Sequence, residues 1–325
     1  MTMRPDLEIA LREKLGDLTI EPLTGDASSR RFYRLRPTSG ESRIVMDYGE
    51  PFEEPSGDQR MTQIFQAAAL PVPDIQASFP LIGAIVLQDL GDRMLEDELN
   101  RAKISADHPK MLESAVILAS RIVLDGTPQL KEAGRLDAPR LDNDRFRFEM
   151  EFFLENFVEK HLKMTGDQSE LRALLLDLAA SAAESSDPVL CHRDYHSRNI
   201  MIHGDSELVM VDIQDGQAGP DSYDLASLLF DAYVEIDDSW RAPLIRLFVE
   251  RIGVELEPFQ RRLMTVATQR MIKALGTFGF QIEIKQNRRY ESAIPRTMCR
   301  LATILPLNPG LLPIHQQFER LGMYR

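Results

Sequence analysis

The most constraining feature of this sequence is the stretch Cys191–Asp215, because it sets three oxygen-bearing side chains at a fixed spacing. Asp194 closes a His-Arg-Asp triplet, Asn199 follows it by five residues, and Asp212 ends an apolar run thirteen residues later. Phosphoryl transfer from a nucleotide needs one carboxylate beside the acceptor hydroxyl. It also needs an amide oxygen and a second carboxylate to hold Mg²⁺ against the phosphates. The spacing therefore predicts Asp194 as the catalytic carboxylate and Asn199 and Asp212 as metal ligands.

Short apolar segments around these residues predict how they are held. Asn199–Ile202 and Leu208–Val211 are strand-like and flank a turn, so we expect a hairpin with Asn199 at its start and Asp212 at its end. Pro188–Cys191 reads as a short buried strand that leads into the His-Arg-Asp triplet.

The pattern of the chain changes near Gly91, from strand-rich before it to helix-rich after it. Before Gly91 we expect helices at Pro5–Leu15 and Gly57–Leu70, and strands in the two parts of Ile20–Leu35, in Arg43–Tyr48 and in the two parts of Phe79–Leu87. After it we expect helices that include His108–Asp125, Arg145–Lys160, Asp167–Ser186, Ser239–Ile252, Pro258–Phe280, Tyr290–Ile304 and Leu311–Leu321. We predict an N-terminal nucleotide-binding lobe of residues 1–90 and a helical C-terminal lobe of residues 91–325 with the catalytic loop and the substrate site.

Composition limits the class of partner. The 325 residues carry a net charge of −13, which argues against a general binder of nucleic acid or of membrane surfaces. The two cysteines do not form a disulfide framework or a metal-binding spacing. The first residues carry charges, unlike a signal peptide, and no apolar run approaches membrane-spanning length. We expect a cytoplasmic protein that acts on a small molecule, with no nucleic acid, membrane or obligate protein partner.

The catalytic stretch, preceded by a strand-rich lobe, resembles the protein-kinase-like superfamily, and within it the aminoglycoside phosphotransferase and choline kinase group. The resemblance covers nearly the whole chain. It implies an α+β, bilobal protein-kinase-like fold, with a small antiparallel-sheet N-lobe containing one helix and a larger, mostly helical C-lobe. It also implies ATP and Mg²⁺ as cofactors.

Several further segments are similar to the anomeric amino-sugar kinases of bacterial peptidoglycan recycling. These kinases phosphorylate the 1-hydroxyl of N-acetylmuramate and N-acetylglucosamine. The matching segments are Gly25–Ser28, Val45–Asp47, Asp89–Arg93, Phe148–Phe153, His192–Asn199 and Asp212–Asp215. Gln269, Arg270, Lys273 and the residues from Gly276 onward resemble the C-terminal helix of the same kinases.

Motif position assigns the remaining roles. The nucleotide is expected at a small-residue turn and at a hinge, which comprise Gly25, Asp26, Ala27, Ser28, Ser29, Arg31, Gln88, Asp89 and Leu90. The acceptor is expected near His196, Arg198, Gln214, Asp215 and Glu149. For His196 and Arg198 an internal supporting role is equally open. His192 and Asp224 are expected to support the catalytic loop by internal contacts.

One element of the wider kinase pattern is missing. The strand that usually carries a phosphate-binding lysine reads Val45-Met46-Asp47, and the helix at Gly57–Leu70 has no glutamate to pair with such a lysine. The amino-sugar kinases share Val-Met-Asp, so its presence does not imply inactivity. We expect Arg30, Arg31 or Arg34 to supply part of the missing positive charge.

Three functions remain open at this stage. The first is an ATP-dependent kinase for an amino-sugar hydroxyl, and the second is a phosphotransferase for an aminoglycoside, a choline-like amine or another hydroxylated metabolite. An aminoglycoside pocket needs several carboxylates, which Glu149, Glu151, Asp215 and Asp221 could supply. The third is a nucleotide-binding pseudokinase, which the missing lysine favours and the intact Asp194 opposes.

Overall fold

The computed structural model describes residues 3–23, 30–101, 107–137, 139–184 and 187–324. These residues form an α+β protein with a five-stranded antiparallel sheet and a larger helical part, which confirms the predicted fold class. Their internal contacts divide the chain into two compact units. One comprises Met1–Arg93 with Met201–Asp215, and the other Met94–Ile200 with Gly216–Arg325.

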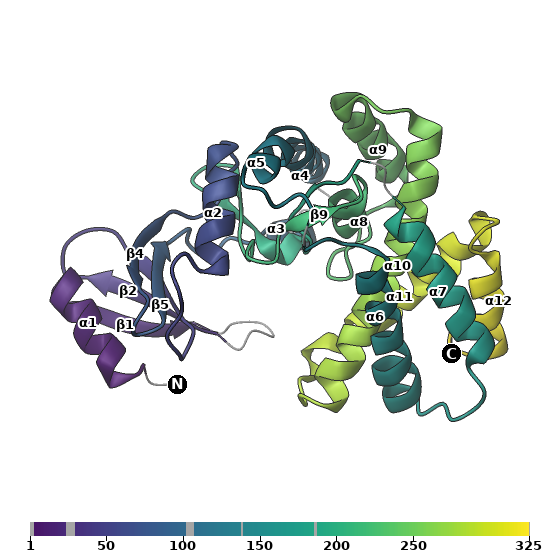
Figure 1. Ribbon diagram of the computed structural model, residues 1–325, viewed down its shortest axis with the longest axis horizontal. Helices are drawn as coiled ribbons and strands as arrows, with labels where there is room; N and C mark the ends of the chain where they lie inside the picture. Colours follow the sequence, from purple (N-terminus) through teal and green to yellow (C-terminus); the bar gives the residue numbers. More distant parts are fainter. Residues whose placement is uncertain (1–2, 24–29, 102–106, 138, 185–186, 325) are drawn as a thin grey trace. The chain divides into compact units, whose positions relative to one another are not determined.

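The first unit is built on a sheet with the strand order β1-β2-β3-β5-β4 (Figure 1). The register places Tyr33, Val45 and Val86 in one row, and they pack with Leu7 of helix α1 (Pro5–Leu15) in a common core. The strands are β1 (Leu18–Leu23), β2 (Arg31–Pro37), β3 (Arg43–Asp47), β4 (Ile75–Phe79) and β5 (Ala84–Gln88).

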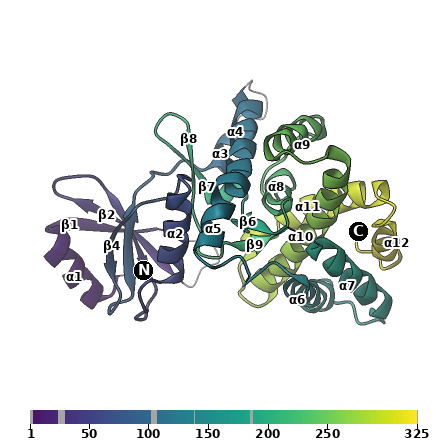
Figure 2. The same cartoon turned by 45° about the horizontal axis from the view of Figure 1, so that its top comes forward.

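Helix α2 (Gly57–Ala67) covers the other face of the sheet (Figures 1 and 2). It begins with a capping box, in which the Ser56 hydroxyl accepts from the Gln59 N–H and the Gln59 side chain accepts from the Ser56 N–H. Met61, Ile64 and Phe65, at positions i, i+3 and i+4, lie on its buried side.

The expectation of two strands within Phe79–Leu87 was wrong for the first strand, which ends at Phe79 instead of beginning there. Residues 80–83 are mostly apolar but form the turn, in which the Gly83 N–H donates to the Phe79 carbonyl at 2.8 Å. Gly83 has φ of 76°, and Leu81 is 87% exposed. The apolar turn therefore imitates a strand in the sequence.

The hairpin of β7 (Ile200–His203) and β8 (Glu207–Met210) forms as expected, and most of it belongs to the first unit. The Met210 N–H donates to the Pro71 carbonyl, and the Ile202 N–H to the Arg93 carbonyl, both at 2.9 Å. Residues 201–215 therefore belong to the first unit, whereas the division expected from the sequence places them in the C-terminal lobe.

The second unit is helical, and the 28-residue helix α10 (Leu256–Glu283) packs against many of its other elements. The other α-helices of the second unit are α3 (Leu95–Arg101), α4 (Asp107–Arg121), α5 (Thr127–Glu132), α6 (Asn143–Phe153), α7 (Ser169–Ala183), α8 (Tyr223–Leu229), α9 (Asp238–Ile252), α11 (Ala293–Ile304) and α12 (Leu312–Arg320). A short sheet pairs β6 (Val189–Cys191) with β9 (Gln217–Gly219). Within the described ranges, no helix combines the length and the apolar character needed to cross a membrane.

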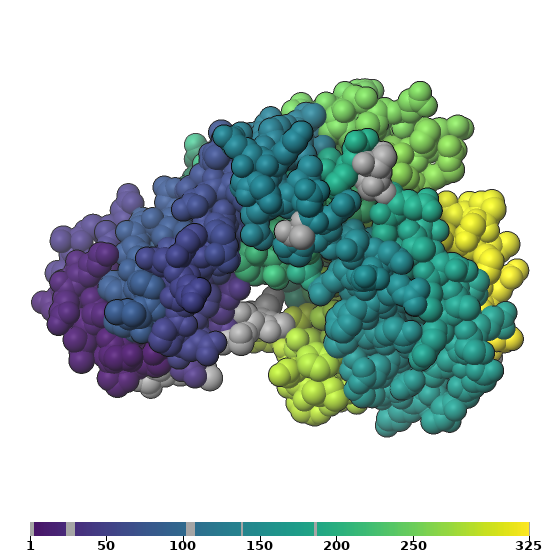
Figure 3. Space-filling model, viewed as in Figure 1, coloured from purple at the N-terminus to yellow at the C-terminus, as the bar shows by residue number. Residues whose placement is uncertain are grey.

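Two of the expected long helices change their winding near their ends. Helix α4 continues as a π-helix at Ile122–Gly126, and α6 continues as a π-helix at Leu154–His161. Helix α12 packs against α7, and the yellow surface of the C-terminal residues meets teal surface in Figure 3. Arg320 of α12 pairs with Glu170 of α7 at 2.9 Å. The sequence predicts the helical segments but not these changes of winding, because the apolar spacing of a short segment does not distinguish a π-helical turn from an α-helical one.

Candidate active site

The loop around the His-Arg-Asp triplet is held by a buried carboxylate on α8. The two oxygens of Asp224 accept from the backbone N–H groups of His192 at 2.7 Å and of Arg193 at 3.0 Å. Arg193 has φ of 83°, a value that non-glycine residues seldom adopt, so these hydrogen bonds hold an unfavourable backbone conformation. His192 is fully buried. The supporting roles expected for His192 and Asp224 are confirmed.

A second carboxylate holds the end of the same loop. Asp231 accepts from the Ser197 N–H at 2.8 Å and from the Ser197 hydroxyl at 2.5 Å, and its other oxygen accepts from the Tyr233 N–H at 2.7 Å. The Tyr195 hydroxyl donates to the Ala115 carbonyl of α4 at 2.7 Å. The catalytic loop is therefore fixed from several sides, as positioning of a reacting group requires.

Asp194 lies beside two positive charges of α10. The ammonium group of Lys273 is 3.0 Å from Asp194 Oδ1, and an Arg270 nitrogen is 3.5 Å from the same oxygen. Burial favours the neutral acid, but these charges outweigh it and hold the pKa of Asp194 well below its usual range. Asp194 is therefore ionised at neutral pH, as a group that orients an acceptor hydroxyl should be.

The two predicted metal ligands have oxygen atoms suited to Mg²⁺. The amide nitrogen of Asn199 donates to the Asp194 carbonyl at 3.0 Å, so the amide oxygen is the atom left to coordinate a cation. Asp212 is exposed, has φ of 62°, and accepts from Gln214 through one oxygen at 2.9 Å. Mg²⁺ prefers such oxygen ligands in small number, together with phosphate oxygens. The donor set therefore fits the expected metal.

His196 is an uncharged contact of the loop. Its ring packs edge-on against Tyr233 with 5.3 Å between ring centres. Removal from water lowers the pKa of His196 below its usual value, in spite of the nearby carboxylates Asp231 and Asp194. The contact with Tyr233 agrees with the internal supporting role left open for His196.

Arg198 and Glu149 make contacts within the second unit. Two nitrogens of Arg198 bind Glu96 of α3 at 2.8 and 3.1 Å, and the guanidinium lies 3.6 Å from the centre of the Tyr233 ring. Glu149 is 4% exposed and accepts from Arg145 at 3.0 Å and from Gln269 at 2.8 Å. These contacts agree with the supporting role left open for Arg198. They also leave Glu149 little surface for an acceptor, because its carboxylate is buried and both of its oxygens accept hydrogen bonds.

The nucleotide-binding turn, with Gly25, Asp26, Ala27, Ser28 and Ser29, lies outside the described residues. The expected hinge follows β5. Gln88 pairs with Asp74, whereas no described residue hydrogen-bonds to the backbone of Asp89 or Leu90. The Asp89 side chain is buried against Arg34 at 2.7 Å. The Asp89 side chain thus holds the hinge, while the backbone groups of Asp89 and Leu90 lack partners among the described residues.

The three candidate arginines differ in their surroundings. Arg34 is 5% exposed and binds Asp89 together with Asp92. Arg30 pairs with Asp58 at 2.9 Å. Arg31 is exposed at the start of β2, and no ion pair of its side chain is found within the described part of the chain.

The strand that lacks the phosphate-binding lysine carries a buried ion pair. The carboxylate of Asp47, at the end of β3, is fully buried and binds Arg4 at 2.8 Å and the Gly49 N–H at 2.9 Å. This strand end therefore carries an internal ion pair within the first unit.

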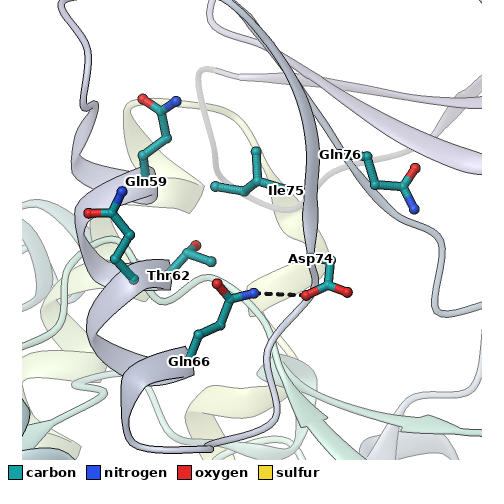
Figure 4. Close-up of a pocket in the computed structure, with 7 residues that line it drawn as sticks. Gln59, Thr62, Gln66, Asp74, Ile75 and Gln76 are labelled. Carbon is teal, nitrogen blue, oxygen red and sulfur yellow. Dashed lines mark hydrogen bonds between the residues drawn. The ribbon is translucent and has the colours of Figure 1, made fainter.

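A pocket of about 490 Å³ lies between α2 and the start of β4 (Figure 4). It is lined by Gln59, Thr62, Gln63, Gln66, Asp74, Ile75 and Gln76. The Gln66 amide donates to Asp74 at 2.8 Å. No residue predicted to bind the nucleotide or the acceptor lines this pocket, so we assign it no part in the chemistry.

The pairing of α10 with Asp194 was not predicted. The sequence singles out Arg270 and Lys273 only by their resemblance to a C-terminal helix. Their three-residue spacing places them on one face of a helix, which is a weak signal that the face is functional. Nothing in the sequence indicates that this face meets Asp194, 79 residues earlier in the chain.

The antiparallel sheet, the helical unit and the braced Asp194–Asn199 loop together define a protein-kinase-like phosphotransferase. The sequence pattern of the phosphotransferase enzyme family, APH, matches residues 19–256. The chain belongs to this family. It is an ATP-dependent phosphotransferase.

Curated relatives extend over most of the chain. An N-acetylmuramate/N-acetylglucosamine kinase of Pseudomonas aeruginosa is 27% identical over 303 residues, covering 89% of this chain and 85% of the relative. A protein of the same name from Neisseria meningitidis is 26% identical over 319 residues, covering 95% of this chain and 92% of the relative.

Solved structures share the fold at low sequence identity. A gentamicin complex of APH(2")-IIa has a TM-score of 0.62 at 11% identity and covers 92% of this chain and 97% of that one. The choline kinase LicA from Streptococcus pneumoniae has a TM-score of 0.56 at 12% identity and covers 86% of this chain and 98% of that one. At these identities the likeness concerns the fold alone.

Proposed function

We propose that this protein transfers the γ-phosphate of ATP to the anomeric hydroxyl of N-acetylmuramate and N-acetylglucosamine, in cell-wall recycling. The names of the relatives support this choice of acceptor. The observation that carries it is the pair of positive charges, Lys273 and Arg270, beside the catalytic carboxylate. An N-acetylated amino sugar carries no positive charge, and N-acetylmuramate carries a carboxylate, so neither is repelled by this pair.

In this proposal Asp194 orients the anomeric hydroxyl towards the γ-phosphate. The transition state of phosphoryl transfer is loose, so placement of the hydroxyl matters more than the basicity of the carboxylate. Asn199 and Asp212 are the proposed Mg²⁺ ligands, and the bound ion would offset negative charge on the phosphates. Gln214 and Asp215 are proposed to contact the sugar.

The nucleotide is proposed to lie at the 25–29 turn, at Arg31, and at the hinge of Gln88, Asp89 and Leu90. The backbone groups of Asp89 and Leu90 are the proposed contacts for adenine. A cytoplasmic location is proposed with this function, because ATP is the phosphate donor.

A polycationic acceptor agrees less well with the described charges. Three of the four carboxylates that such a pocket would need already contact cations of the chain itself. Glu149 binds Arg145, Asp221 binds Arg262 at 2.8 Å, and Glu151 lies 3.4 Å from Arg172. An aminoglycoside or a choline-like amine is therefore the second candidate, and a pseudokinase is disfavoured by the braced Asp194.

The test is ADP release measured with N-acetylmuramate, N-acetylglucosamine, a kanamycin-type aminoglycoside and choline. We expect turnover with the two sugars only, and a 1-phosphate product by phosphorus NMR. Asp194→Ala should abolish transfer and leave ATP affinity within about threefold, because the carboxylate acts on the acceptor. Turnover with kanamycin or choline and not with the sugars would reject the proposed acceptor. Undiminished turnover of Asp194→Ala would reject the proposed site.

A further inference from the structure

We infer that Lys273 of α10 is a positioning residue for phosphoryl transfer, which fixes the Asp194 carboxylate so that Oδ2 faces the acceptor hydroxyl. The inference rests on the proposed function in that the reaction is transfer to a hydroxyl held by Asp194. It does not depend on which sugar is the acceptor.

The contacts of Asp194 are unevenly divided between its two oxygens. Lys273 and Arg270 both approach Oδ1, at 3.0 and 3.5 Å, and no described residue forms a hydrogen bond or ion pair with Oδ2. The Lys273 side chain is 19% exposed and that of Asp194 is 28% exposed, so the contact is partly shielded from water. A charged hydrogen bond in such a place is stronger than one on an open surface. It therefore restricts rotation of the carboxylate and leaves Oδ2 as the working atom.

Two other side chains of the catalytic loop, Arg198 and His196, make contacts elsewhere. Arg198 binds Glu96 through two hydrogen bonds, and His196 packs against Tyr233. The positive charge nearest to Asp194 therefore comes from α10, far along the chain.

The two cations of α10 that lie beside Asp194 have different roles. Arg270 donates to the Arg193 carbonyl at 2.6 Å and lies 4.4 Å from the centre of the Tyr223 ring, so it supports the loop backbone. Lys273 forms an ion pair with the Asp194 carboxylate itself. Replacing Lys273 should therefore disturb the reacting group more than the fold.

Close packing of helix α10 against its neighbours limits where the backbone of Lys273 can lie. A Cβ on Gly276 would lie 2.8 Å from the Phe153 Cα, and one on Gly279 would lie 2.4 Å from the Asn156 carbonyl oxygen. The helix thus packs against α6 and its π-helical continuation at backbone contact. Gln269 also donates to the buried Glu149.

The experiment compares Lys273→Met, Lys273→Arg and the control Arg261→Met, an exposed residue of the same helix that pairs only loosely with Glu257 at 3.7 Å. We expect Lys273→Met to lower kcat about a hundredfold with either sugar, because misplacement of a reacting group has an effect of this size. KM for ATP and for each sugar should stay within about threefold of the wild-type values. The kcat of Lys273→Arg should be about tenfold higher than that of Lys273→Met. Arg261→Met should match the wild type.

A double-variant cycle separates positioning from a structural role. In the Asp194→Asn background, Lys273→Met should lower the residual rate by less than about threefold, because the two groups act as a unit. If the losses in rate from the two substitutions multiply, the two groups act independently and the inference is overturned. An unchanged kcat in Lys273→Met would also overturn it. A rise in KM confined to N-acetylmuramate would also overturn it, by making Lys273 a ligand of the sugar carboxylate.

The rate of ATP hydrolysis without sugar, in which water accepts the phosphoryl group, distinguishes failure of one proposal from failure of the other. If the wild type uses neither sugar, the proposed function fails. Lys273 is then tested on the hydrolytic rate, where Lys273→Met should again reduce kcat at unchanged KM for ATP. An undiminished hydrolytic rate in Lys273→Met would reject the inference even if the sugars are substrates.

Discussion

At the scale of single residues, the predicted chemistry depends on side chains held in unusual backbone conformations. Arg193 and Asp212 have φ of 83° and 62°. Such conformations cost roughly 1–3 kcal/mol for a non-glycine residue unless neighbouring contacts stabilise them. Asp224 provides those contacts at Arg193, and Gln214 bonds the Asp212 side chain. Strained backbone therefore occurs at Asp212 and directly before Asp194, and also at Ala69, Lys163 and Gln286, for which no role is predicted.

The missing phosphate-binding lysine leads to a prediction at the same scale. We expect Arg31→Ala to weaken ATP binding about tenfold, because a hydrogen bond to a charged group contributes roughly 1.5–3 kcal/mol. Arg34→Ala should instead lower the free energy of unfolding by about 3 kcal/mol, because it leaves Asp89 buried without its partner. Calorimetric titration with ATP and urea unfolding measure the two effects.

Arg36→Ala is the control for this comparison, because Arg36 lies on the same strand and is exposed. Arg36→Ala should leave the ATP affinity and the free energy of unfolding unchanged. If ATP affinity is unaltered in the alanine variants of Arg30, Arg31 and Arg34 alike, none of these arginines replaces the lysine.

At the scale of elements, α10 is the part of the second unit that reaches the catalytic loop. One stretch of it contacts Glu149 through Gln269, the loop backbone through Arg270 and the catalytic carboxylate through Lys273. One turn further, Gly276 and Gly279 allow the close approach to α6. The position of the cations thus depends on small residues that carry no chemistry themselves.

Gly279→Ala tests this dependence. The new Cβ would lie 2.4 Å from a backbone oxygen, so α10 must shift. We expect a loss of about 2 kcal/mol in the free energy of unfolding, in spite of the better helix propensity of alanine, together with a lower kcat. Gly310→Ala, where no atom lies within 4 Å of the new Cβ, should change stability by less than about 0.5 kcal/mol. Equal stability of the two variants in urea unfolding would show that the close approach has no energetic consequence.

At the scale of the whole molecule, the predicted groups are divided between the two compact units. Asp194, Asn199 and Lys273 belong to the second unit, whereas Asp212 and Asp215 belong to the first. The boundary between the units falls at the start of β7, and the hairpin of β7 and β8 hydrogen-bonds to Pro71 and Arg93 of the first unit. The residues proposed as metal ligands therefore come from both units.

Removal of Mg²⁺ tests this assignment for the intact protein. We expect excess EDTA to lower kcat by more than about a thousandfold, because the charge on the transferred phosphate is then not neutralised. Added Mg²⁺ should restore the rate. Asn199→Ala and Asp212→Ala should each raise the Mg²⁺ concentration needed for half-maximal rate, whereas Arg36→Ala should not. Full activity in EDTA would contradict the metal assignment.

The sequence predicted much of the local structure for identifiable reasons. Helices α1 and α2 and the strands β1, β2, β3 and β5 follow from the spacing of apolar residues. The bracing role of Asp224 followed from its place in a motif and is confirmed by two hydrogen bonds. The first strand within Phe79–Leu87 was mispredicted, because an exposed apolar turn carries the same pattern as a buried strand.

By itself, the sequence determined the class of chemistry, because Asp194, Asn199 and Asp212 lie on one continuous stretch whose spacing is fixed by local structure. Only the tertiary structure decided which cations meet which carboxylates. Arg198 pairs with Glu96 across 102 residues, and Lys273 with Asp194 across 79 residues. Such pairs depend on how helices pack, which the short-range periodicity of a sequence does not record. The environment of the catalytic carboxylate is therefore a property of the fold.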